Sequence, residues 1–356
     1  MYRRLLFTIH GYSSKGIMPS GILCNVEDPT IDETHGDVVH PCVRFIKPGF
    51  EGHKWWMVYT PYYGENSKLE NPRLCYADVS EDELPVKWNY YCTIVDLPEK
   101  GYNSDPTVLY DNGQLYVFWR ENHTQRASDL GCSRITVGCK VHSRQISYLS
   151  DPQLKEVSIS IDREVSPTII KTKSSYRAYA IHMNFVPNYI TRLPSIIGSK
   201  LYRLKLVFLL DALGICDMNK NYGVAVWESP SLENSFHYLR TIGFQNSSNL
   251  YQPWHMDLFE SDFNEDNGLY AVVQSRQRHA RICLARSDDG NNFYFYKKPL
   301  LTSKTIGMTG LYKPSAVQVG NRLYLFYTVH NNRDRNLNQL FVTFIDWESL
   351  LGKITE

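Results

Sequence analysis

The residues of this chain with the clearest capacity for chemistry are carboxylates and histidines beside proline or aromatic residues. Asp105 precedes a proline, His40 precedes another, and His255 follows a tryptophan. Two carboxyl groups that flank a glycosidic bond can cleave it, one as acid and the other as base or nucleophile. Histidine can share the proton transfer or hold a hydroxyl. These residue types therefore suggest cleavage of a sugar linkage.

Asp105 is the first predicted catalytic carboxylate, and two glutamates compete to be its partner. Glu70 stands in Glu-Asn-Pro and Glu121 in Arg-Glu-Asn, each in or after an aromatic-rich segment. We predict that Asp105 works with Glu70 or Glu121, with Arg120 tuning the pKa of its neighbour or binding an acidic sugar. The structural alternatives are that Asp105 bonds a backbone amide and that both glutamates are ordinary loop residues.

His40, Asp105 and His255 belong to a segment that recurs along the chain. Each copy begins with a polar residue, which is usually followed by a proline and then by an apolar run. The five copies are His40-Pro41-Cys42-Val43, Asp105-Pro106-Thr107-Val108, Ser166-Pro167-Thr168-Ile169, His255-Met256-Asp257-Leu258 and Lys313-Pro314-Ser315-Ala316-Val317. Aromatic-rich second strands are predicted over Lys54–Thr60, Gln114–Arg120, Tyr176–His182, Gly268–Val273 and Arg322–Val329. Third strands are predicted over Arg73–Asp78, Arg134–Val141, Tyr222–Glu228, Arg281–Arg286 and Gln339–Asp346.

Repeated antiparallel units of three to four strands are typical of a β-propeller, the alternative being a β-sandwich with coincidental hairpins. We predict an all-β fold, one five-bladed β-propeller domain over residues 1–356. Its blades start near 40, 105, 166, 255 and 313, with an insertion at about 183–221. Because the fifth unit ends after its third strand, Arg3–Ile9 or Gly16–Asn25 is expected to close the ring as the outer strand of the last blade.

In a propeller the leading residues of the five units would meet at one level of the central channel, where polar groups are costly to bury for structure alone. We therefore predict that they bind substrate together with nearby aromatic and charged residues. The predicted substrate-binding residues are His40, Arg120, Trp254, His255, Asp257, Lys313, Tyr62, Tyr63 and Ser166. Trp254 would supply a sugar platform beside the hydrogen-bonding ring of His255. The alternative for Lys313 is that it only neutralises the channel.

Five units that open on a polar-proline dipeptide resemble the propellers of family 43 glycoside hydrolases and related glycosidase-like proteins of bacteria and phages. The Ser-Asp-Asp-Gly turn at 287–290 resembles the Asp-box of sialidases and related propellers. The resemblance implies a glycoside hydrolase, with an Asp, an Asp and a Glu leading the first three blades. This chain has His40, Asp105 and Ser166 there, with Glu164 two residues before Ser166. The departure keeps a second hypothesis open, a non-catalytic glycan-binding propeller such as a phage recognition module.

Composition limits the partners and cofactors. The net charge of +1, from 38 basic and 37 acidic residues, argues against nucleic-acid binding. No stretch approaches the roughly 20 apolar residues of a membrane helix, so no membrane partner is expected. No signal peptide is evident, which predicts a cytoplasmic or virion-associated protein. No nucleotide-binding or zinc motif occurs, so no cofactor is predicted, although the resemblance allows an ion in the channel. The sequence leaves the oligomeric state and the sugar open.

Overall fold

The computed structural model describes residues 16–30, 37–62, 66–122, 128–136, 138, 140–146, 164–183, 222–234, 236–245, 253–261, 263, 268–275, 280–307, 310–331 and 337–355. Three regions named above lie outside these residues: Arg3–Ile9, Tyr63 and 184–221 of the predicted insertion.

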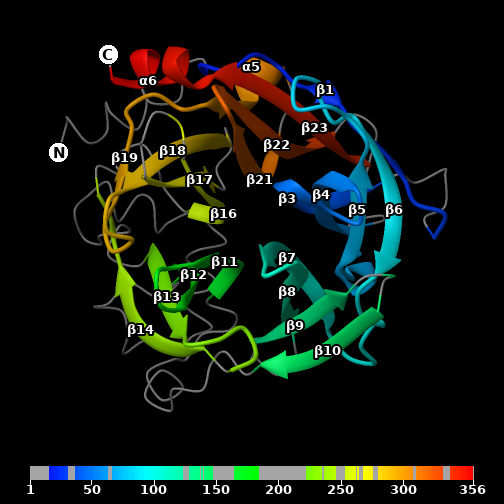
Figure 1. Ribbon diagram of the computed structural model, residues 1–356. Coiled ribbons are helices and arrows are strands. Elements are labelled where there is room, and N and C mark those ends of the chain that lie inside the picture. Colours follow the sequence, from blue (N-terminus) through cyan, green and yellow to red (C-terminus); the bar gives the residue numbers. More distant parts are fainter. Residues whose placement is uncertain are drawn as a thin grey trace, which may run out of the picture.

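Five blades of mostly antiparallel strands form a ring around a central axis, and the innermost strand of each blade lies nearest that axis (Figure 1). The innermost strands are β3 (Val38–Phe50), β7 (Tyr102–Asp111), β11 (Glu164–Lys171), β16 (Pro253–Glu260) and β21 (Gly310–Val319). The predicted five-bladed propeller is therefore confirmed.

Each blade continues outward from its inner strand. Blade 1 adds β4 (His53–Pro61), β5 (Arg73–Ala77), β6 (Lys87–Thr93) and β2 (Asn25–Glu27). Blade 2 adds β8 (Gln114–Asn122), β9 (Ser128–Thr136) and β10 (Lys140–Ile146). Blade 3 adds β12 (Tyr176–Met183), β13 (Tyr222–Ser229) and β14 (His237–Ile242). Blade 4 adds β17 (Leu269–Ser275), β18 (Arg281–Ser287), β19 (Phe293–Phe295), β15 (Phe244–Gln245) and β20 (Leu301–Thr302).

Blade 5 contains β22 (Arg322–Asn331) and β23 (Leu337–Asp346), and the N-terminal strand β1 (Ile22–Leu23) completes it. Ile22 pairs with Val342 and Leu23 with Phe341 in antiparallel register. The predicted closure is confirmed, with the strand drawn from 16–25. The next strand, β2, pairs in parallel with β6, so the N-terminal segment joins the last blade to the first.

Asp28 anchors this segment to blade 1. Its carboxylate accepts hydrogen bonds from Tyr59 Oη and from Arg73 Nη1, the latter at 2.7 Å. Burial opposes ionisation of Asp28, but bonds from Thr30, Tyr59 and Arg73 outweigh it and lower its pKa.

A lowered pKa means that Asp28 stabilises the fold above about pH 4, its unfolded value, and that this contribution is lost as the pH falls through the folded value. We expect Asp28→Asn to lower the free energy of unfolding by about 1–3 kcal/mol at pH 7 and to flatten its fall below pH 4. Urea denaturation at several pH values tests this, with Asp82→Asn, 92% exposed, as the control. Equal profiles for both variants would contradict it.

The core lies between neighbouring blades, and β4 shows why the aromatic strands suit this role. Trp55 packs in a cluster with Tyr324 and Phe326 of blade 5, whereas Trp56 packs with Trp119 of blade 2. Successive side chains of a strand point to opposite faces, and both faces of this strand are buried from Trp55 onward.

One predicted strand has different bounds in the structure, and two short helices accompany the blades. The predicted third strand Arg134–Val141 straddles the turn between β9 and β10, because Gly138 adopts φ 76° there and starts a hairpin. The short helices α5 (Ser303–Ile306) and α6 (Trp347–Thr355) lie beside blade 5 (Figure 1). No helix among the described residues has the length and apolar character needed to cross a membrane.

Candidate functional site

A β-bulge on each innermost strand turns polar side chains toward the channel. The pairing register shifts around the leading residue in all five blades. In the first three blades His40, Asp105 and Ser166 adopt φ of 57°, 51° and 54°, each just before a proline. This left-handed conformation is costly for residues other than glycine. The bulge accommodates this conformation and changes the direction of the side chain. The proline after it lies where the strand needs no backbone N–H for the sheet.

Asp105 lies at the centre of the resulting network and is 1% exposed. Its Oδ2 accepts a hydrogen bond from Arg120 Nε at 3.0 Å. Its Oδ1 lies 3.2 Å from His255 Nδ1 and 3.9 Å from Lys313 Nζ, and it accepts from Ser166 Oγ at 3.4 Å. Residues of blades 2, 3, 4 and 5 therefore converge on one carboxylate.

His40 of blade 1 brings a second carboxylate to the same place. His40 Nε2 lies 3.6 Å from Asp105 Oδ1, and His40 Nδ1 lies 3.3 Å from Glu70 Oε2. The Nδ1 atom also contacts Thr60 Oγ1 at 2.9 Å, while Glu70 Oε2 is buried without a hydrogen bond. The two carboxylates thus approach the two nitrogens of one imidazole ring.

The loop after β4 holds Glu70 in this position. Glu70 follows the 3-10 turn Ser67–Leu69, and its carbonyl accepts a hydrogen bond from the Asn103 backbone at 3.2 Å. Asn103 Nδ2 also donates to Asn71 Oδ1 at 3.0 Å. Because Asn103 lies on β7, these bonds tie the loop of blade 1 to blade 2.

The charges of the network shape one another. Burial opposes ionisation of Asp105, but His40, Arg120 and His255 around it hold its pKa well below the usual range. Burial lowers the pKa of His255 to about 3, which Asp105 only partly offsets. Burial raises the pKa of Glu70, with His40 opposing the shift. Asp105 is therefore a fixed negative charge, while Glu70 is the carboxyl better suited to exchange a proton.

Asp257 lies two residues further along β16 and forms a separate polar layer. Its carboxylate accepts two hydrogen bonds from Arg44 of blade 1, at 2.8 and 2.9 Å. It also accepts from Thr168 Oγ1 at 3.0 Å and from Ser315 Oγ at 2.6 Å. These contacts support a structural cross-link of blades 1, 3, 4 and 5 for Asp257, which we predicted to bind substrate.

Other predicted residues lie around the network. Glu121 follows Arg120 on β8, so strand alternation points its half-buried side chain to the opposite face. Trp254 contacts His255 edge-to-face, with ring centroids 6.1 Å apart. Tyr62 is half-buried just after β4, at the end of blade 1 that carries His40.

Tyr312 belongs to the network although the sequence analysis missed it. Its hydroxyl lies 3.3 Å from His40 Nε2, and its ring lies edge-to-face on that of His255, with centroids 4.4 Å apart. The signal available was its place just before Lys313, which leads the fifth polar-proline segment. The bulge exposes both residues to the channel side of the strand, which an alternating pattern does not predict.

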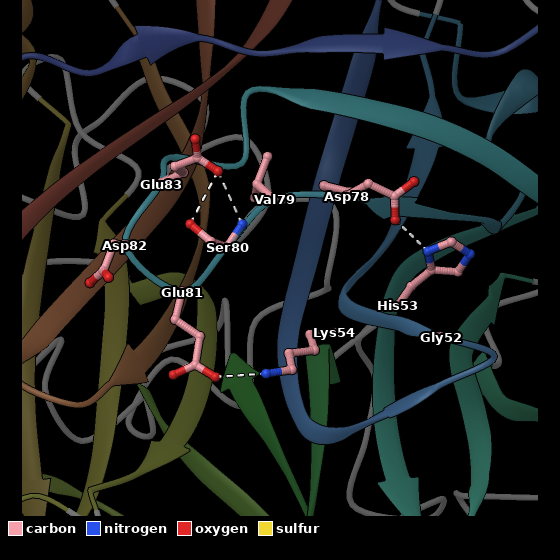
Figure 2. A pocket seen from close by; sticks show the side chains of 10 residues that line it. Gly52, His53, Lys54, Asp78, Val79, Ser80, Glu81, Asp82 and Glu83 are labelled. Carbon is pink, nitrogen blue, oxygen red and sulfur yellow. Dashed lines mark hydrogen bonds and ion pairs between the residues drawn. The ribbon is translucent and has the colours of Figure 1, made fainter.

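A depression at the opposite end of blade 1 is a weaker candidate (Figure 2). It lies where β4 begins, whereas His40 faces the end of that strand. Its charged groups pair with one another: His53 with Asp78, and Lys54 with Glu81 at 2.8 Å. These groups are partly exposed, so this surface lacks the buried, converging polar atoms found around Asp105.

Within the described ranges, one group of side chains could hold a metal ion, namely His40, Asp105 and His255. One donor atom from each lies within 4.8 Å of the others, and all three residues are buried.

Comparison with known proteins identifies similar folds but does not assign the chain to a family. No family profile matches the sequence, and no curated protein is similar to it. Among solved structures, an N-acetylgalactosamine deacetylase from F. plautii, in complex with blood group B trisaccharide, is similar with a TM-score of 0.65 and 14% identity over 96% of this chain and 97% of that one. A levansucrase from B. megaterium has a TM-score of 0.58 and 10% identity over 93% and 90% of the two chains.

A third similar structure is a GH43 β-xylosidase/α-arabinofuranosidase from a compost microbial metagenome, in complex with xylotriose. Its TM-score is 0.55, with 11% identity over 92% of this chain and 94% of that one. The described chain therefore has the five-bladed propeller fold of these carbohydrate-active proteins.

Proposed function

We propose that this chain hydrolyses a bond in a polysaccharide or oligosaccharide, with Glu70 as the proton-transferring carboxyl and Asp105 as its buried charged partner. The observation that supports this most strongly is the approach of Glu70 and Asp105 to the two nitrogens of His40, at 3.3 and 3.6 Å. Three solved structures with the same fold act on or bind sugars according to their descriptions.

In this proposal Glu70 exchanges a proton with the reacting group, and His40 passes or holds that proton. A carboxyl with a raised pKa is suited to this role near neutral pH. Asp105 keeps its negative charge, orients His40 and His255, and stabilises positive charge that develops near them. Trp254 and Tyr62 would supply aromatic surface for the sugar ring beside this centre.

A non-catalytic glycan-binding function is the second candidate. It is favoured because both Asp105 oxygens are engaged within the protein and the polar ring is at most 8% exposed. A nucleophile or base must reach its substrate, which such an Asp105 cannot do without rearrangement.

The test is a chain-length assay with the wild type and Asp105→Asn on bacterial and plant glycans, followed by size chromatography and measurement of released acyl groups. We expect the wild type to change at least one glycan and Asp105→Asn, if folded, to lose most of that activity. Retention of a glycan on an affinity gel without any change in it would favour the binding function. Full activity of the variant would exclude Asp105 from the mechanism.

A further inference from the structure

The geometry points to a binding site for one divalent transition-metal ion, such as Zn²⁺ or Mn²⁺, formed by His40, Asp105 and His255. This inference does not depend on the proposed hydrolysis, because an ion can bind whether or not the channel cleaves a substrate. The three ligands come from blades 1, 2 and 4, so only the closed ring brings them together.

The distances between the donor atoms suit such an ion. The two contacts from Asp105 Oδ1 are 3.2 Å to His255 Nδ1 and 3.6 Å to His40 Nε2. Tetrahedral ligands about 2.1 Å from a zinc ion lie about 3.4 Å from one another. An ion beside Asp105 Oδ1 could therefore take both histidine nitrogens as ligands, because the three donor atoms lie within 4.8 Å of one another.

The ligand types select the class of ion. Calcium and magnesium prefer sites built almost entirely from oxygen. Two imidazole nitrogens and one carboxylate oxygen instead favour zinc, manganese, iron, cobalt or nickel. Three protein ligands also leave at least one coordination position open for water or substrate.

Groups around the ligands support the site. Metal-binding residues commonly hold their remaining polar atom in a hydrogen bond that fixes their orientation. Here Thr60 Oγ1 contacts His40 Nδ1 at 2.9 Å, and Arg120 Nε donates to Asp105 Oδ2 at 3.0 Å.

His255 is buried as deeply as the other two ligands, at 1% exposure. Its Nδ1 atom is the nitrogen that faces Asp105 Oδ1, at 3.2 Å, and is therefore the ligand atom that we assign to the ion. The hydroxyl oxygen of Ser166 also contacts His255 Nδ1, at 2.5 Å.

A nearby positive charge should weaken binding of the ion, so removing that charge predicts tighter binding. Lys313 Nζ lies 3.9 Å from Asp105 Oδ1, close to the place that the ion would take. Because like charges repel, removing the ammonium should favour a bound cation. Lys313→Met, which keeps all three ligands, is therefore expected to bind the ion more tightly than the wild type.

The experiment uses tag-free protein stripped with a chelator and titrated with Co²⁺ alone, followed by calorimetry and by the visible absorption of the bound ion. We expect one ion per chain in the wild type. His40→Ala, Asp105→Asn and His255→Ala should each weaken binding by about 100-fold or more. His237→Ala replaces an exposed histidine of β14 and should bind as the wild type does.

Thermal unfolding of each variant shows which ones are folded and can be interpreted. The inference fails if the folded wild type binds no Co²⁺ or Zn²⁺, if it binds Ca²⁺ alone, or if the ligand variants bind as well as His237→Ala. Should the ligand variants unfold, equal or weaker binding by folded Lys313→Met would overturn it. Since these readouts are independent of turnover, a metal site and a failed hydrolysis remain distinguishable.

Discussion

Replacing Glu70 with glutamine is expected to lower kcat on the cleaved glycan by about 10²–10⁴-fold. Glutamine keeps the size of the side chain but cannot exchange a proton. The effect should fall on kcat more than on KM, because the lost interaction belongs to the transition state. Steady-state kinetics on the glycan identified in the chain-length assay measures it.

Glu121→Gln is the matched control, since Glu121 is the alternative partner that the sequence left open. Glu121 lies on the opposite face of β8 from Arg120. We expect its variant to keep activity within a few-fold of the wild type. A large loss in Glu121→Gln with an active Glu70→Gln would reverse the assignment, and full activity in both would remove glutamate from the mechanism.

The fold was predictable because two levels of pattern agree in every blade. The polar-proline segments and the aromatic strands both recur. Strand alternation explains why Trp55 and Trp56 are buried in two different hydrophobic clusters, on opposite faces of β4. The turn at Asp289 was also readable: its carboxylate accepts from the Asn291 and Asn292 amides, at 2.7 and 3.0 Å, and Gly290 takes φ 67°. The outer hairpin of blade 2 was not predicted, because the predicted strand Arg134–Val141 ran through Gly138, where the chain turns with φ 76°.

The site was predictable only in part, because the spatial order of the blades supplies its contacts. The polar-proline repeat predicted that His40, Asp105 and Ser166 would converge. It could not show that Arg44 crosses the channel to Asp257, since sequence separation carries no information on partners across a ring. Nor could it identify Tyr312, which depends on a bulge.

Asp257→Ala is expected to lower the free energy of unfolding by about 3–5 kcal/mol. The carboxylate is 2% exposed and holds both donors of the Arg44 guanidinium. Its removal leaves the Arg44 guanidinium, whose side chain is only 18% exposed, without a counter-charge, and it takes the acceptor from the hydroxyls of Thr168 and Ser315. Urea denaturation measures the loss.

Two controls separate a buried cross-link from an ordinary ion pair. Glu81→Ala breaks the exposed pair with Lys54, whose side chains are both 44% exposed, and should cost about 0–1 kcal/mol. The double variant Arg44→Met, Asp257→Leu removes both charges. It should recover part of the lost free energy of unfolding, because apolar side chains fill the space and leave no unpaired charge. A cost for Asp257→Ala no larger than that of Glu81→Ala would mean that the pair does not join the blades. Asp257 would then be free to serve the substrate, as the sequence alone suggested.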